Sequence, residues 1–300
     1  MGKQNLDDSD TLAEPLYEPL YDIDELEIIY DPVFTLGVPH NAPSEFKKYV
    51  VAAAKAYYLG HRSIDYTLKK YGSYLSFNSE PSRMEKRFWR FSRFIKEHLA
   101  SNKVRMNSIS NKPDRVGLVV AGGVIIRLTS SFQSALLLSR FGFFFEAGCI
   151  CRFILEQLAW AYSVHEIEDD SLFKTSVTRS VGKLKELIPH CGKLYGFLSN
   201  LAHISPGYTK EYILFDEGCP AVVVATTRNL DTIIYWLLLL LDICQIVTEV
   251  IYLPLVSEHL HIAIDKHNDI SVNENRPLLG LISEFREKYI RSKGSQSTKK

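Results

Sequence analysis

The chain has 300 residues and a formal net charge of zero, with 35 Lys and Arg against 35 Asp and Glu. Its hydrophobic fraction of 46% and charged fraction of 23% are typical of a globular protein and exclude a fibrous or wholly disordered chain. A neutral chain has no overall electrostatic attraction for nucleic acid or an anionic membrane, so binding to either requires a local basic patch.

Residues 1–43 are rich in Asp, Glu and Pro, and we expect them to form an acidic arm that is extended or disordered. The N-terminus lacks the apolar segment of a secretory signal. The five cysteines include no CxxC pair, which favours buried free thiols in a reducing compartment. Together these features predict a cytoplasmic protein.

An N-terminal helical section is expected over 44–110. The apolar spacing predicts helices over 44–59 and 63–71, each followed by a glycine that ends it. The polar stretch 101–114 is expected to be a loop, and we place the boundary between this section and the rest of the chain there.

A basic amphipathic helix is predicted inside this section. Ser82 and Glu85 have the spacing of a capping box, which marks the start of the helix. Arg87, Arg90 and Arg93 lie on its polar side among aromatic residues, so they are candidate RNA contacts through phosphate binding and base stacking. Two alternatives stay open: a solvated helix face, and a docking site for the chain's own acidic arm.

Residues 111–256 are expected to form the core helical bundle, with a small β-hairpin inserted at 211–226. The hairpin is predicted because two short strand-like runs flank a turn that contains Gly and Pro. The predicted helices of the bundle cover 116–128, 131–165, 172–187, 192–203 and 230–253. Residues 257–300 are expected to add a C-terminal helix and a basic tail.

The segment 232–256 has the length and apolar character of a membrane span. It also carries Asp242, Gln245 and Glu249 at helical spacing, and such groups are costly in a bilayer. We therefore expect a buried bundle helix and no membrane association. The predicted fold class is mainly α: a helical bundle with a small β-hairpin insert and an N-terminal helical extension.

Two pairs of polar residues are candidates for chemistry. Arg152 and Glu156 lie one turn apart on an apolar helix, as a structural ion pair or as part of a pocket whose guanidinium binds phosphate or carboxylate. Ser199 and His203 are four residues apart and share a helix face. His203 is either a capping or core residue or a general acid–base, since an imidazole changes its protonation near neutral pH.

The runs Phe141–Ala147, Arg152–Gln157 and Leu198–His203 resemble a family of uncharacterised bacterial helical-bundle proteins. In that family a long helix carries an Arg-x-x-x-Glu signature, and a later helix ends in Leu-Ser-x-x-x-His. The resemblance covers residues 116–256. The family is distantly similar to HEPN bundles, many of which are metal-independent ribonucleases or components of toxin and defence systems, often as dimers.

The HEPN motif is an Arg, a polar residue and, a few positions later, a His. Asn200 and His203 match its last two members, and Ser199 stands where the Arg is expected. The resemblance implies either an interaction or regulatory protein of a stress or defence system, with Arg152, Glu156 and His203 structural, or a metal-independent ribonuclease. In the ribonuclease His203 exchanges a proton with a ribose hydroxyl, Arg152 stabilises the phosphate, and Ser199 or Asn200 orients the substrate. A second copy, RNA and another protein are the expected partners, and no cofactor or metal is expected.

Overall fold

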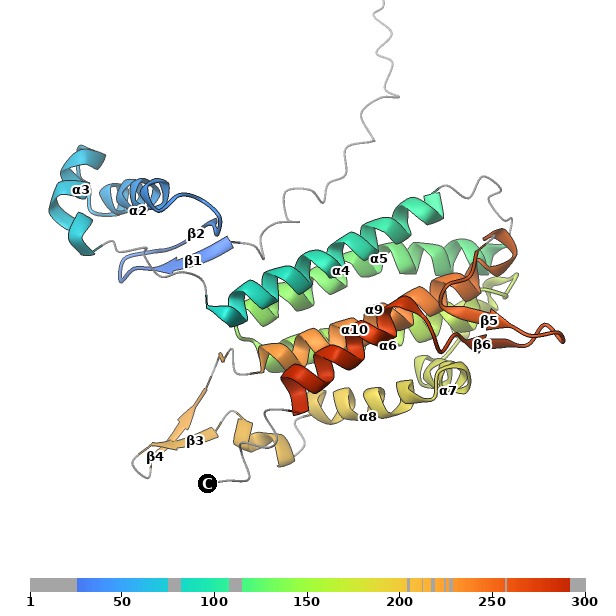
Figure 1. Ribbon diagram of the computed structural model, residues 1–300. Helices are drawn as coiled ribbons and strands as arrows, with labels where there is room; N and C mark the ends of the chain where they lie inside the picture. Colours follow the sequence, from blue (N-terminus) through green and yellow to red (C-terminus); the bar gives the residue numbers. More distant parts are fainter. Residues whose placement is uncertain are drawn as a thin grey trace, which may run out of the picture. The chain divides into compact units, whose positions relative to one another are not determined.

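The computed structural model describes residues 26–74, 82–107, 115–203, 206–211, 213–216, 219–223, 225–226, 229–256 and 258–291. The chain is mainly α-helical and divides into two compact units, Met1–Lys86 and Arg87–Lys300 (Figure 1). The predicted fold class is confirmed: a helical bundle with a β-hairpin insert follows an N-terminal helical extension. Residues 1–25 of the predicted acidic arm and residues 292–300 of the predicted basic tail lie outside the described residues.

The first unit is a β-hairpin followed by two helices. Its elements are β1 (Leu26–Tyr30), β2 (Thr35–Pro39), α2 (Ser44–Tyr58) and α3 (Ile64–Tyr71). Phe34, Leu36 and Val38 alternate along the chain, so they lie on one face of the hairpin; Phe34 joins Val51 and Ala52 of α2 in a small core. Part of the sequence predicted to be an extended or disordered arm is therefore an ordered hairpin that supplies core residues.

Helix α4 (Arg83–Asn107) begins with the predicted capping box. The backbone N–H of Ser82 donates to Glu85 Oε2 at 3.0 Å, and the N–H of Glu85 donates to Ser82 Oγ at 3.2 Å. The helix then continues through residues 101–107, so the predicted loop is wrong there, because Asn102 and Met106 are buried and packing overrides the polar composition. The units divide at Lys86 rather than near residue 110, so most of α4 belongs to the bundle.

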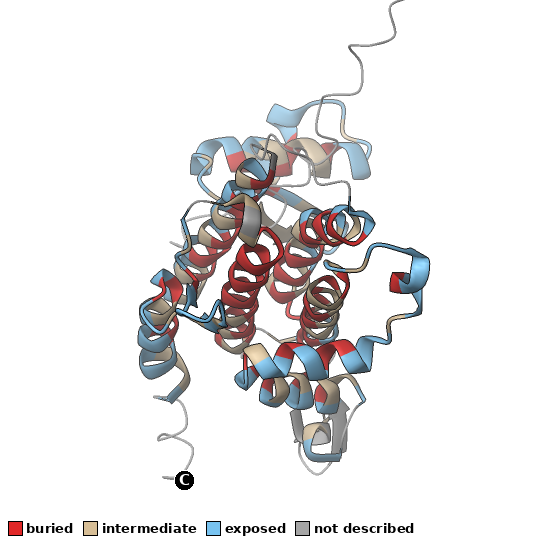
Figure 2. Ribbon diagram, turned by 90° about the vertical axis from the view of Figure 1, so that its right-hand side faces the viewer, coloured by how far each residue is buried: buried red, intermediate tan, exposed pale blue. Residues whose placement is uncertain are grey.

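The bundle is built around α6 (Phe144–Val164), which packs against α5, α7, α8 and α9. The bounds of these helices are Val116–Arg140 for α5, Val177–Leu187 for α7, His190–Ala202 for α8 and Leu230–Ile251 for α9. Figure 2 shows the buried side of each helix turned toward the interior of the bundle. Helix α9 is buried along nearly its whole length, including the predicted polar stripe of Asp242, Gln245 and Glu249.

The single long helix predicted over 131–165 is wrong, because the chain breaks between α5 and α6. Gly142 has a φ of +81°, in the left-handed region that favours glycine. Its carbonyl accepts a hydrogen bond from the backbone N–H of Thr226 at 2.8 Å. The break therefore joins the start of α6 to the chain that follows the inserted hairpin.

Two hairpins follow α8. Strands β3 (Ile213–Asp216) and β4 (Cys219–Val222) pair antiparallel within the predicted range 211–226. Strands β5 (Ile262–Ile264) and β6 (Ile270–Val272) form a second hairpin that the sequence did not predict, because each strand has only three residues. Helix α10 (Pro277–Phe285) comes next and continues as a π-helical turn over Arg286–Arg291.

Two described helices, α5 and α9, are long and apolar enough to cross a membrane by length and composition. Of the two, the sequence pattern had indicated only the α9 segment as a membrane-length stretch. In α9, 89% of the most apolar window is buried inside the bundle, which accounts for its apolar character. Only 44% of the corresponding α5 window is buried, and Val119 on that helix is 61% exposed.

Candidate functional site

Four polar side chains from α6 and α8 meet at the surface of the bundle. Arg152 Nε donates to Glu156 Oε1 at 2.9 Å, Arg152 Nη1 lies 3.0 Å from His203 Nε2, and Arg152 Nη2 donates to Tyr195 Oη at 3.3 Å. Tyr195 Oη in turn donates to Glu156 Oε1 at 3.2 Å. We call these four residues the Arg152 site.

Helical spacing explains how two short segments build this site. Arg152 and Glu156 are one turn apart on α6, so their side chains meet without help from the rest of the fold. Tyr195, Ser199 and His203 follow each other at four-residue intervals, which places them along one side of α8. Since α8 packs against α6, that side of α8 meets the Arg152–Glu156 pair.

The Arg152 site is reached by solvent. The side chains of Arg152 and Glu156 are 22% and 21% exposed, and His203 is exposed. Burial opposes the charge on Arg152, but the hydrogen bond with Tyr195 and the charge of Glu156 raise the pKa of the guanidinium above its ordinary value. Arg152 is therefore a fixed cation.

The contact between Arg152 and His203 defines the tautomer of the imidazole. A guanidinium has N–H donors and no acceptor, so Nε2 of His203 accepts and the ring proton lies on Nδ1. Nε2 then carries the lone pair that a general base uses. In the absence of a ligand, this lone pair accepts the hydrogen bond from Arg152 Nη1.

The two residues expected to orient a substrate lie in different surroundings. The hydroxyl of Ser199 is buried and has no hydrogen-bond partner among the described residues. Asn200 is exposed. Of the two, only Asn200 presents its polar atoms to solvent.

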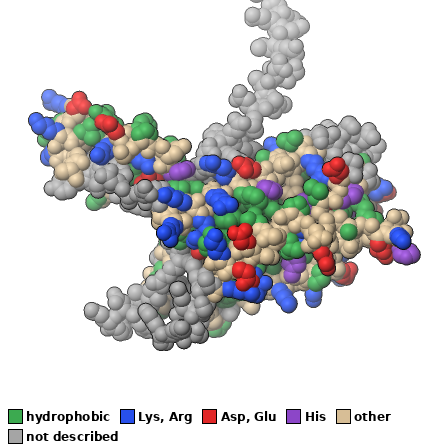
Figure 3. All heavy atoms as spheres, viewed as in Figure 1, with side chains coloured by type: hydrophobic (Ala, Val, Ile, Leu, Met, Phe, Trp, Pro, Cys, Tyr) green, Lys and Arg blue, Asp and Glu red, His purple; other side chains and the backbone are tan. Residues whose placement is uncertain are grey.

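The three arginines of the basic helix also differ from one another. Figure 3 shows Lys and Arg side chains gathered over the first half of α4. Arg87 is bound to buried Asp231, with Nη2 2.7 Å from Oδ1, and it lies 4.1 Å from the ring centre of Tyr289. Arg90 and Arg93 are exposed. Arg87 thus joins α4 to α9, and only the other two present their guanidinium groups to solvent.

Three of the four aromatic residues of α4 are buried, and the fourth, Phe94, is half-buried. Phe88, Trp89 and Phe91 are 0%, 7% and 6% exposed. Rings at this depth pack in the core and are not available to nucleic-acid bases. Phe94 is therefore the one aromatic residue of α4 left for base stacking, and phosphate contacts at Arg90 and Arg93 stay a prediction.

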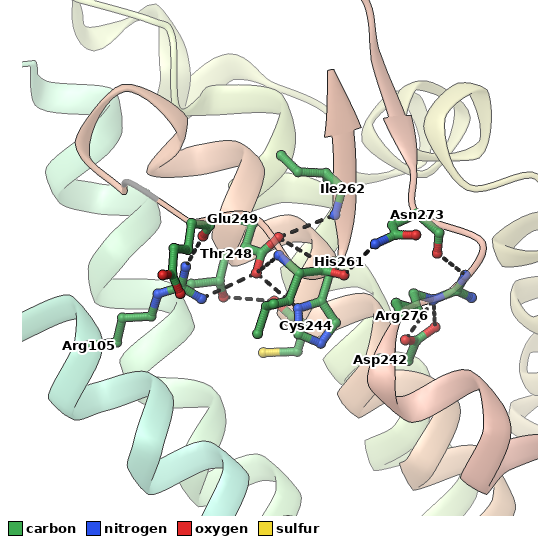
Figure 4. Close-up of polar contacts among 11 residues, drawn as sticks. Arg105, Asp242, Cys244, Thr248, Glu249, His261, Ile262, Asn273 and Arg276 are labelled. Atoms are coloured by element: carbon green, nitrogen blue, oxygen red, sulfur yellow. Dashed lines mark hydrogen bonds and ion pairs between the residues drawn. The ribbon is translucent and has the colours of Figure 1, made fainter. Parts of the chain in front are cut away.

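A second polar network, which the sequence did not predict, surrounds Glu249 on α9 (Figure 4). Its buried carboxylate accepts from the backbone N–H groups of Leu260, His261 and Ile262 at 3.1, 2.8 and 3.2 Å. Oε1 also lies 3.0 Å from His261 Nδ1 and 3.2 Å from Arg105 Nη1. Burial alone would raise the pKa of Glu249, but the hydrogen bonds from His261 and the backbone lower it to about 2.

About two turns before Glu249 on α9, Asp242 forms the other buried ion pair of the stripe. Arg276 Nε lies 2.8 Å from Oδ1 and 2.9 Å from Oδ2, and Arg276 Nη1 donates to the carbonyl of Asn273 at 3.1 Å. The polar stripe of α9 therefore binds the chain that follows it, at Glu249 and at Asp242. These networks hold β5, β6 and α10 on the bundle.

The described residues contain no group of three or more His, Cys, Asp and Glu side chains placed to hold a metal ion. Cys149, Cys151, Cys191 and Cys244 are free thiols, and burial raises the pKa of Cys191 and Cys244 to about 12, so both stay protonated. Nδ1 of buried His261 lies 3.0 Å from Glu249 Oε1.

Tyr195 is the residue of the Arg152 site that sequence reasoning missed. It lies four residues before Ser199 on the same side of α8, so the helical spacing that linked Ser199 to His203 was the signal that could have found it.

Comparison with known proteins adds no further guide: no protein-family description, no curated protein and no solved structure matches this chain.

Proposed function

We propose that the chain is a metal-independent ribonuclease that acts at the Arg152 site. The observation that carries the proposal is that a cation, a carboxylate and an imidazole converge where solvent reaches them, and that the lone pair on Nε2 of the imidazole contacts the cation itself. These are the groups that cleavage of RNA through its own 2′-hydroxyl requires: a base for the hydroxyl and a positive charge for the phosphate. The HEPN-like resemblance of the sequence points to the same reaction.

In the proposed reaction Nε2 of His203 takes the proton of the ribose 2′-hydroxyl. The 2′-oxygen forms a bond to phosphorus, and the bond from phosphorus to the 5′-oxygen breaks with its electron pair. The leaving 5′-oxygen takes a proton from water, and the hydroxide so formed takes the proton from His203. The products are a 2′,3′-cyclic phosphate and a 5′-hydroxyl, and His203 is neutral again. Arg152 stabilises the extra negative charge on the non-bridging phosphate oxygens, and Asn200 orients the ribose.

Substrate must first displace the contact between Arg152 and His203, because one lone pair cannot accept from Arg152 and also take a proton. A phosphate replaces His203 as the partner of Nη1, and a guanidinium has more N–H groups than its three present contacts use. Glu156 and Tyr195 keep the guanidinium oriented during this exchange.

The test is degradation of a mixed RNA pool in EDTA by wild type and by the variants His203→Ala and Arg152→Ala. The proposal predicts cleavage by wild type and a loss of about 100-fold or more in each variant. The exposed residues His267 and Arg179 give matched controls, and their alanine variants should cleave as wild type does. Circular dichroism of every variant separates lost chemistry from lost folding. Wild type without activity, or activity that survives both substitutions, contradicts the proposal.

A second function is favoured by a different observation. Every nitrogen of the Arg152 guanidinium already has a partner on α6 or α8, which is what a structural clamp requires. We propose as the alternative an interaction or regulatory bundle of a stress or defence system, with a second copy or another protein as its partner. It predicts that Arg152→Ala lowers the thermal unfolding midpoint while wild type cleaves no RNA. Light scattering of wild type would test for the second copy.

A further inference from the structure

A cavity of about 650 Å³ lies between α8, α9 and α10, and the Arg152 site does not use it. Leu194, Trp236 and Ile282 line it and are 7%, 4% and 5% exposed, so its walls are apolar and well packed. Leu239 and Leu279 extend the apolar wall, and the rings of Phe197 and Tyr235 complete it. A volume of this size suits a small organic molecule rather than a water cluster or a protein segment.

Exposed basic residues lie along the rim of this cavity. Lys193 on α8 and Arg286 after α10 both line it, and both are exposed. Neither has an ion-pair partner within the described parts of the chain. The acidic residue that lines the cavity, Asp242, is bound to Arg276. The opening therefore carries positive charge that the described chain does not neutralise.

The polar end of the cavity adds further donors. Arg276 gives Nε to Asp242 and Nη1 to the carbonyl of Asn273, while its Nη2 has no partner among the described residues. His190 lines the same end, where burial lowers the pKa of its imidazole despite the charge of Asp242. The cavity thus offers an apolar interior with N–H donors and positive charge at its edge.

We propose that this cavity binds a small amphipathic organic anion. Its aromatic or aliphatic body would lie against Leu194, Trp236 and Leu239. Its carboxylate, sulfonate or phosphate group would lie at the rim, against Lys193 and Arg286. A charged group at the rim keeps part of its hydration, which avoids the large cost of burying an anion, while the body gains from apolar burial.

The cavity is a separate site from the Arg152 site, although both use α8. His190, Lys193, Leu194 and Phe197 face α9 and α10, whereas Tyr195 and His203 meet Arg152 on α6. The inference therefore does not rest on the proposed function. Ligand binding here is measured directly and does not depend on RNA cleavage.

The experiment compares two fluorescent probes that share one aromatic body. 8-Anilinonaphthalene-1-sulfonate is anionic, and N-phenyl-1-naphthylamine is the same body without the sulfonate. We expect wild type to bind the anionic probe saturably at one site and more tightly than the neutral probe. The double variant Lys193→Ala/Arg286→Ala should bind the anionic probe about 10-fold more weakly and the neutral probe as before.

Two further variants make the result decisive. Ser283 is exposed at the rim, so Ser283→Trp narrows the cavity with little effect on folding. This variant should bind both probes more weakly than wild type. Lys174→Ala/Lys266→Ala removes the same charge from exposed positions that do not line the cavity and should change neither. The proposal is overturned by an absence of saturable binding, by equal binding of the two probes, or by an affinity for the anionic probe that Lys193→Ala/Arg286→Ala leaves unchanged.

Discussion

Replacing Glu249 by Gln tests whether the buried network on α9 fixes the C-terminal part of the bundle. An amide has one oxygen, and its nitrogen is a donor. If the nitrogen takes the place of Oε2, the N–H groups of His261 and Ile262 lose their acceptor. If it takes the place of Oε1, the N–H of Leu260 and Nη1 of Arg105 lose their acceptor. Each buried N–H left unpaired costs roughly 1–3 kcal/mol, so Glu249→Gln should lower the free energy of unfolding by about 3 kcal/mol or more.

The assay is urea unfolding at neutral pH, followed by circular dichroism, with Glu166→Gln as the control at an exposed carboxylate. The control should differ from wild type by less than about 0.5 kcal/mol. A loss below about 1 kcal/mol for Glu249→Gln would refute the reasoning, since it would mean that the backbone of residues 260–262 finds other acceptors.

The same substitution predicts a change in pH dependence. The pKa of Glu249 is lowered from its ordinary value of 4.5 to about 2. Because the pKa of Glu249 is lower in the folded state, its ionised carboxylate stabilises the folded state fully at pH values above about 4.5, the pKa in the unfolded chain. This stabilisation is lost as the pH falls from about 4.5 toward 2. The contribution is of the order of 3 kcal/mol, and the gap between wild type and Glu249→Gln should shrink over this interval. A gap that stays constant with pH would contradict the ionised state of Glu249.

Three other predictions concern single positions. Gly123→Ala, on the open side of α5, should stabilise the folded chain by up to about 1 kcal/mol. Gly117→Ala should destabilise it by about 2 kcal/mol, because the new Cβ would clash with a carbonyl at the end of α6. The midpoint of urea unfolding measures both effects. Ser199→Ala removes a buried hydroxyl that has no described partner, so both the urea midpoint and RNA cleavage should stay close to wild type. Arg87→Met leaves a buried carboxylate without its guanidinium and should cost about 3 kcal/mol, against less than about 0.5 kcal/mol for exposed Arg90→Met in the same assay.

Features that depend on neighbours in the sequence were predicted well. The capping box of Ser82 and Glu85 and the pair of Arg152 and Glu156 need only helical spacing, and both form as expected. Apolar periodicity likewise predicted the mainly α fold. The break at Gly142 was missed because the phenylalanines on both sides continue an apolar pattern, and the hydrogen bond that fixes it comes from Thr226.

Contacts between residues that are far apart in the sequence could not be predicted from it. Arg105 and Glu249 are 144 positions apart, and no pattern in the sequence joins them. The partner of Arg276 could not be identified for the same reason. Lys96 follows Arg93 by three residues, which by helical periodicity places it on the polar side of α4, yet it is 4% exposed because packing of the whole bundle decides which side of α4 is covered. Sequence alone therefore found Arg152, Glu156 and His203 of the Arg152 site, but it found neither Tyr195 nor the networks that hold the bundle closed.

The most direct test of the central claim is the chemistry of cleavage at the Arg152 site. A short oligonucleotide with one ribose in an otherwise deoxyribose strand is incubated with wild type in EDTA, and its products are analysed by mass spectrometry. We predict cleavage after the ribose alone, with a 2′,3′-cyclic phosphate on one product and a 5′-hydroxyl on the other, and none with His203→Ala. An intact strand, or cleavage at the deoxyribose positions, would contradict a role for His203 as the base that activates a 2′-hydroxyl.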